Sequence, residues 1–166
     1  MQDDLDDAIT HLAKQGIADP KRVCIVGGSY GGYAALRAAQ RDHGIYRCAV
    51  SYAGVSDMAA ILRHDASFLN GSRSKDYWRS QSPDLKGASP VNFAADFSIP
   101  VLIMHGKADA RVPVKQSREM VERLKAAGKT YRYVEQPEGD HHFSREADRI
   151  QFLKEMEAFL KQYNPA

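Results

Sequence analysis

The chain has 166 residues, of which 43% are hydrophobic and 27% are charged, a balance typical of one globular domain with its own core. Its net charge of +2, with both signs interspersed, does not indicate a nucleic-acid surface or partner. We expect no membrane span, because the sequence lacks an apolar run of about 18 residues, and no signal peptide is visible.

Helix-like and strand-like patterns alternate along the chain. Apolar residues at helical spacing predict a first helix that ends at Gly16: Leu5, Ala8, Ile9, Leu12 and Ala13. Short apolar runs predict four strands, over Val23–Val26, Arg47–Tyr52, Val101–Met104 and Tyr131–Glu135. Three more helices are predicted, one ending at about Arg41, one over Val114–Ala127 and one over about Arg145–Tyr163. The last helix has an apolar stripe that we expect in the core: Phe152, Leu153, Met156, Phe159, Leu160 and Tyr163.

This alternation predicts an α/β fold, a mostly parallel sheet with helices on both faces. Polar residues suited to chemistry follow the predicted strands: Ser29, Asp57, Asp109, His141 and His142. Because parallel sheets place their sites at the carboxyl ends of the strands, we expect these side chains to converge there. No repeat or linker divides the chain, and residues 53–98, where aromatics alternate with Gly, Ser, Asn and Pro, give no clear element.

A glycine-rich turn follows the first strand. Its sequence, Gly27-Gly28-Ser29-Tyr30-Gly31, matches the Gly-x-Ser-x-Gly pattern of a nucleophile elbow, in which a serine stands on a sharp strand-to-helix turn. We expect Gly27 and Gly31 to allow a close backbone approach that a Cβ would block. A plain glycine-rich turn is the simpler alternative. A dinucleotide site is disfavoured, because the dinucleotide fingerprint needs glycine where Ser29 stands.

A nucleophilic serine needs a base and an orienting carboxylate, which follow it in the order acid, then histidine, in hydrolases of this kind. His141 and His142, in a glycine-containing loop after the fourth strand, are the candidate bases. His105 ends the third strand and is interpreted as structural. Asp109 is favoured as the acid, because its loop follows the strand next to that of the histidines. Asp57 is the alternative, although it suits a turn or a helix cap equally well.

Three segments together resemble the catalytic domain of the prolyl oligopeptidase family. They are Gly27-Gly28-Ser29-Tyr30-Gly31-Gly32, His105-Gly106-x-x-Asp109-x-x-Val112-Pro113 with Gln116-Ser117, and Glu138-Gly139-Asp140-His141-His142-Phe143. The resemblance runs over nearly the whole chain. It implies an α/β-hydrolase fold, peptidase or esterase activity, and Ser29, Asp109 and His141 as nucleophile, acid and base. The family usually has glycine where His142 stands, and the register to Phe143 favours His141.

The resemblance also implies that the strands and the β-propeller that usually precede this region lie outside the chain. We therefore expect residues 1–166 to form a partial α/β-hydrolase catalytic domain, truncated on its N-terminal side. The N–H of Tyr30 would supply one oxyanion-hole donor, and the second would lie upstream. Losing one donor costs about 10²–10³ in rate, so we expect a weak catalyst. The open edge of the elbow strand predicts a homo-oligomer that covers it. The default location is the cytoplasm, since any export signal would lie upstream.

The sequence gives less information about the substrate than about the reaction. We expect Tyr52, Val55, Arg111 and Val112 to bind substrate beside Ser29, because each lies near the carboxyl end of a strand. Three aromatic residues would either cap this site or fill the core: Phe68, Tyr77 and Trp78. A small, open site favours short-chain esters, which demand less of the oxyanion hole than amides do. The alternatives are a serine peptidase of the dipeptidyl or acylaminoacyl type and a non-catalytic interaction module. No metal or cofactor is expected.

Two further features have more than one interpretation. Cys24 and Cys48 each fall in a predicted buried strand, where we expect free cysteines that behave as small hydrophobes. A disulfide between neighbouring strands is the alternative. The acidic residues at the start of the chain are expected in the first turn of a helix, with a metal site as the alternative: Asp3, Asp4, Asp6 and Asp7.

Overall fold

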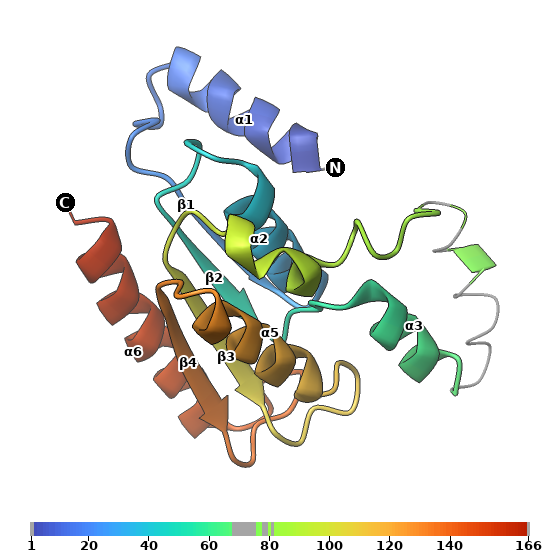
Figure 1. Ribbon diagram of the computed structural model, residues 1–166. Helices are drawn as coiled ribbons and strands as arrows, with labels where there is room; N and C mark the ends of the chain where they lie inside the picture. The colour runs from blue at the N-terminus through green and yellow to red at the C-terminus, as the bar shows by residue number, and fades with distance from the viewer. Residues whose placement is uncertain (1, 68–75, 78–79, 81, 166) are drawn as a thin grey trace.

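The computed structural model describes residues 2–67, 76, 77, 80 and 82–165 (Figure 1). Its centre is a four-stranded sheet in the order β1-β2-β3-β4, in which all neighbouring strands run parallel. The strands span Cys24–Gly28, Cys48–Tyr52, Val101–Gly106 and Tyr131–Gln136. The predicted α/β class with a parallel sheet is confirmed, and the strands lie where the short apolar runs predict them.

Helices cover both faces of this sheet (Figure 1). The helices are α1 (Gln2–Lys14), α2 (Tyr30–Arg41), α3 (Met58–Asp65), α5 (Lys115–Ala126) and α6 (Glu146–Tyr163), with a 3-10 segment η1 over Pro90–Asp96. Side chains alternate between the two faces, as the period of a strand requires. Ala49 and Ile103 pack beneath α2, α5 and η1. Val50 and Leu102 pack against Phe159 of α6 on the other face.

Two of the predicted apolar stripes are only partly buried. Leu153 of α6 is 56% exposed, contrary to expectation, whereas Phe159 is buried and the rest of that stripe packs around it. An 18-residue helix lying on a sheet presents only part of its circumference to the core, and Leu153 lies outside that part. The α1 helix has no buried residue. Ion pairs from Asp3 and Asp6 to Arg41 attach it to α2.

The segment between β2 and β3 contains elements that its composition did not reveal. Asp57 caps α3, accepting a hydrogen bond of 2.9 Å from the Ala60 N–H. Of the three aromatics considered for a cap, Phe68 and Trp78 lie outside the described residues, and Tyr77 is exposed.

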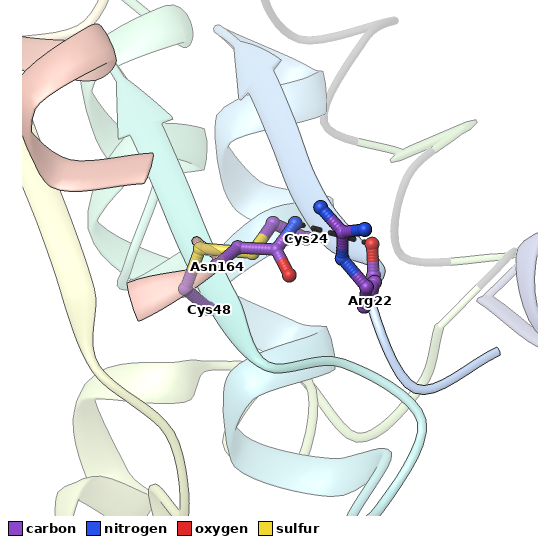
Figure 2. The surroundings of a disulfide bond; sticks show 4 residues. All are labelled: Arg22, Cys24, Cys48 and Asn164. Atoms are coloured by element: carbon purple, nitrogen blue, oxygen red, sulfur yellow. Dashed lines mark hydrogen bonds between the residues drawn. A yellow bond between two sulfur atoms is a disulfide. The ribbon is translucent and has the colours of Figure 1, made fainter. Parts of the chain in front are cut away.

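Cys24 and Cys48 form a disulfide, which corrects the expectation of two free thiols (Figure 2). The two residues are direct partners in the β1–β2 register, with their Cα atoms 4.7 Å apart. Pairing along the strands, which the sequence alone does not specify, brings the two thiols together. Beside the disulfide, the Asn164 side-chain amide donates to the Arg22 carbonyl at 3.1 Å, so the end of α6 is tied to the segment before β1.

The elbow strand lies at an edge of the sheet. β1 pairs with β2 and with no other described strand, and Val26 at its centre is 46% exposed. The open edge predicted for this strand is therefore present. Among the helices of the described part of the chain, none has the length and apolar character that a bilayer crossing requires.

Candidate active site

Ser29 stands alone between the end of β1 at Gly28 and the start of α2 at Tyr30. Its backbone has φ 58° and ψ −117°, in the left-handed half of φ space that serine rarely occupies. The turn is fixed by a 2.8 Å hydrogen bond from the Ser29 N–H to the Tyr52 carbonyl. Strain of this kind persists only where the surrounding structure imposes it, and it is typical of a nucleophile elbow.

The close approach that shapes the elbow depends on Gly27. A Cβ on Gly27 would lie 2.2 Å from the Gly31 carbonyl oxygen, which no real contact allows. Gly31 differs from the expectation, because a Cβ there would meet nothing within 4 Å. The backbone of Gly31 lies against Gly27, so Gly27 is the position that must lack a side chain.

Ser29, His141 and Asp109 form a continuous hydrogen-bonded chain. The Ser29 Oγ lies 3.0 Å from Nε2 of His141, and Nδ1 of His141 lies 2.7 Å from Oδ2 of Asp109. Because a carboxylate can only accept a hydrogen bond, Nδ1 of His141 must carry the proton that is donated to Asp109. Nε2 is then the nitrogen that can accept the proton of Ser29. The two other candidates lie elsewhere: His142 packs edge-on against His141, and Asp57 caps α3.

The Asp109 carboxylate is buried and held from several directions. Its Oδ1 accepts hydrogen bonds of 2.8 Å from the N–H groups of both Arg111 and Val112. Burial alone would raise the pKa of Asp109, but hydrogen bonds from His105, the Val112 N–H and His141 outweigh burial and lower the pKa to about 2. The group is therefore a carboxylate at neutral pH, as a partner of the histidine must be.

The loops that carry Asp109 and His141 are locked together by their backbones. The Ala108 N–H donates to the Gly139 carbonyl at 2.9 Å, and the Lys107 N–H donates to the Gln136 carbonyl at 2.8 Å. A Cβ on Gly106 would lie 2.2 Å from the Gly139 oxygen, so the two loops touch where Gly106 has no side chain. Their relative position, and with it the His141–Asp109 contact, is set by main-chain packing.

Tyr52 does not line the pocket beside Ser29, where the sequence predicted a substrate contact. Its side chain is 3% exposed and is absent from the pocket beside Ser29. The hydroxyl instead donates to the Asp140 carbonyl at 2.7 Å, and the ring stacks on Phe143. Tyr52 packs on the same buried face of β2 as Cys48 and Val50, and its hydroxyl supports the loop that carries His141.

A pocket of about 260 Å³ opens beside Ser29 and His141. Val55, Arg111 and Val112 line it, as expected, and so does Tyr30. The rest of the lining comes from α3: Met58, Ile61, Leu62 and Asp65. These α3 residues were not predicted to line the pocket. The spacing of Met58, Ile61 and Leu62, at i, i+3 and i+4, is the helical signal that would have indicated them.

Tyr30 is the first residue of α2. The N–H groups in the first turn of a helix have no acceptor within the helix, and the helix dipole favours negative charge there. This placement suits the expected oxyanion donor. The second donor stays a prediction.

Comparison with known proteins agrees with this geometry. Residues 1–165 match the prolyl oligopeptidase family. The chain belongs to that family. Its sheet and helices are those of the α/β-hydrolase peptidases, and the solved structure of a puromycin-hydrolysing peptidase from Mycobacterium tuberculosis superimposes with a TM-score of 0.83. That match has 27% sequence identity and covers 95% of this chain and 24% of the peptidase.

Two prolyl oligopeptidase family relatives illustrate the range of similarity. Dipeptidyl aminopeptidase BIII of Pseudoxanthomonas mexicana is 32% identical over 98% of this chain and 24% of its own length. Inactive dipeptidyl peptidase 10 of Rattus norvegicus is 30% identical over 82% of this chain and 17% of its own length. The chain thus spans a quarter or less of the length of these relatives.

Proposed function

We propose that this chain carries the hydrolytic centre of a serine peptidase, with Ser29 as nucleophile, His141 as general base and Asp109 as the orienting acid. The observation that carries the proposal is the chain of contacts, 3.0 Å from Ser29 to His141 and 2.7 Å from His141 to Asp109, on a strained strand-to-helix turn. Membership of a peptidase family supports it independently.

The proposed reaction proceeds through an acyl-enzyme. As the Ser29 oxygen attacks the substrate carbonyl carbon, its proton moves to Nε2 of His141, and the ionised Asp109 stabilises the resulting imidazolium. The oxyanion develops next to the N–H of Tyr30 at the start of α2. His141 then gives the proton to the departing amine, and the Ser29 ester remains. Water, deprotonated by the same histidine, attacks this ester, and the Ser29 oxygen leaves with the proton from His141 as the acid is released.

A peptide is a better-supported substrate than the short-chain ester expected from the sequence. The relatives include a dipeptidyl aminopeptidase and an acylamino-acid-releasing enzyme, and the comparisons do not support the ester preference. The pocket beside Ser29 has an apolar wall formed by Val55 and Val112 with the inner face of α3. That wall suits an uncharged side chain on the acyl side of the cleaved bond.

Labelling with a fluorophosphonate probe tests the nucleophile. We expect labelling of the protein and of Ser98→Ala, in which an exposed serine away from the pocket is removed, and no labelling of Ser29→Ala. Persistent labelling of Ser29→Ala would remove the elbow assignment. Hydrolysis of an aminoacyl anilide should accompany labelling. Hydrolysis of p-nitrophenyl butyrate alone would restore the ester interpretation, and an unlabelled protein would favour the non-catalytic one.

A further inference from the structure

A second histidine lies beside the Asp109 carboxylate. His105, at the end of β3, is 0% exposed. Its Nε2 lies 2.8 Å from the Val112 carbonyl oxygen and 3.3 Å from Oδ2 of Asp109. Its Nδ1 lies 2.7 Å from the Ser117 Oγ, at the start of α5. The proposed reaction makes no use of this imidazole.

The partners of His105 determine which nitrogen carries the proton. A main-chain carbonyl and a carboxylate are both acceptors only, so Nε2 must be protonated to face them. In the neutral imidazole, Nδ1 then accepts the hydroxyl proton of Ser117. The ring is therefore oriented by α5 on one side, and it donates toward Val112 and Asp109 on the other.

These contacts complete the surroundings of the carboxylate. Oδ1 of Asp109 accepts from two main-chain N–H groups, and Oδ2 lies 2.7 Å from Nδ1 of His141 and 3.3 Å from Nε2 of His105. Val112 is held at both ends of its backbone, since its N–H donates to Asp109 and its carbonyl accepts from His105. The imidazole thus links the carboxylate, the loop behind it and α5 in one buried network.

We propose that His105 is a positioning residue that fixes the Asp109 carboxylate so that Oδ2 faces Nδ1 of His141. The inference rests on the proposed function, because the orientation of the Asp109 carboxylate affects catalysis only if His141 acts as a base. It goes beyond the structural role that the sequence suggested for His105. A carboxylate that loses one of its buried donors is free to turn away from His141, and small misplacements of this kind are costly in catalysis.

Two substitutions separate the contact with Asp109 from the bulk of the ring. His105→Leu keeps an apolar side chain of similar size and removes the donor. His105→Gln places an amide N–H where Nε2 stands. We expect His105→Leu to lower kcat about ten- to hundredfold with KM within about twofold of the parent, and His105→Gln to restore most of kcat.

The pH profile gives a readout that packing alone would not move. Asp109 and His142 contact His141, and the charged residues Asp65 and Arg111 line the same pocket; none of the four is altered in these variants. An Asp109 carboxylate that is turned away from Nδ1 stabilises the His141 imidazolium less. The acid limb of kcat/KM should therefore move to lower pH in His105→Leu, by about half a unit or more, and return in His105→Gln.

Tyr46→Phe is the control for the loss of a buried hydrogen bond. It removes the contact of a buried hydroxyl with Asp6 on α1, far from the carboxyl ends of the strands. Its stability should fall, and its pH profile should not change. The proposal is overturned if a folded His105→Leu keeps the parent kcat and acid limb, or if His105→Gln is no better than His105→Leu. If His105→Leu does not fold, Ser117→Ala decides, because it removes the hydroxyl that orients the ring: an acid limb displaced to lower pH supports the proposal, and a parent-like limb overturns it.

A spectroscopic measurement separates this inference from the proposed function. The proton between His141 and Asp109 should give a downfield NMR resonance in the parent and in His105→Gln. We expect it to shift or broaden in His105→Leu. An unlabelled and inactive parent would contradict the proposed function while the resonance still reports on His105. An active parent whose resonance is the same in His105→Leu would contradict the inference alone.

Discussion

At the scale of single residues, the ionisation of Asp109 couples the site to folding. The pKa of its carboxyl is about 2, below its ordinary value of 3.8. A lowered pKa means that the ionised form is favoured in the folded state. The ionised carboxylate contributes its full share to the free energy of unfolding above the ordinary pKa. That share is lost as the pH falls through the pKa of the folded state, so the loss occurs between about pH 5 and pH 2.

We therefore predict that Asp109→Asn makes the free energy of unfolding less sensitive to acid. Between about pH 6 and pH 2 the parent should lose about 2 kcal/mol more than the variant. Urea unfolding at several pH values measures this. Asp57→Asn is the matched control, since asparagine also caps helices and the substitution leaves Asp109 untouched. Parallel acid profiles for the parent and Asp109→Asn would contradict the assignment of the low pKa.

Sequence reasoning located the three central side chains but not their supports. The order of Ser29, Asp109 and His141 and the ends of the strands were sufficient to place them at one edge of the sheet. The choice between His141 and His142 rested on resemblance, because neighbouring residues differ only in where the backbone points them. Tyr52 was misplaced for a related reason: a residue near the end of a strand can face either the pocket or the core.

At the scale of elements, the junction of β1 and α2 depends on one missing side chain. We predict that Gly27→Ala destabilises the fold by about 1–3 kcal/mol and removes most of the activity, because its Cβ would displace the Gly31 backbone and with it Ser29. Gly31→Ala is the control. It adds a Cβ in open space within a helix, and its stability should be unchanged or raised by up to about 1 kcal/mol. Thermal unfolding of both variants measures the difference, and equal losses would contradict the proposed clash.

The disulfide between β1 and β2 should also be visible in stability. It closes a loop across 24 residues of sequence, for which chain entropy gives about 3 kcal/mol. We predict that reduction lowers the free energy of unfolding by about this amount. In the double variant Cys24→Ala/Cys48→Ala, the reductant should have no effect. Mass spectrometry under non-reducing conditions checks the bond itself, and two free thiols in the folded protein would return the original expectation.

The elements that were missed share a physical cause. The disulfide depends on the register of two strands, and register arises from the whole sheet. The α3 helix is only eight residues long and lies in a segment of mixed composition, so its apolar positions give a weak periodic signal. The exposure of Leu153 depends on how α6 lies on the sheet, which its apolar stripe does not specify.

At the scale of the whole molecule, the site combines three strands that are far apart in sequence. Ser29 follows β1, Asp109 follows β3 and His141 follows β4. In the sheet, β2 lies between β1 and β3. Because all four strands are parallel, these ends meet at one edge of the sheet. The main-chain contacts of Gly106 with Gly139 then fix acid against base. The position of the nucleophile depends instead on β1, which among the described strands pairs only with β2.

That one-sided pairing leads to a prediction about assembly. Within the described residues, no strand pairs with the outer edge of β1, and Val26 on that strand is half exposed. We predict a homodimer in which the β1 strands of two copies pair and extend the sheet. Val26→Lys should shift it to monomer, since lysine on an edge strand opposes pairing. Leu153→Lys, which adds the same charge on α6, should not. Sedimentation equilibrium at micromolar concentration measures both, and a monomeric parent would rule out self-pairing at this edge.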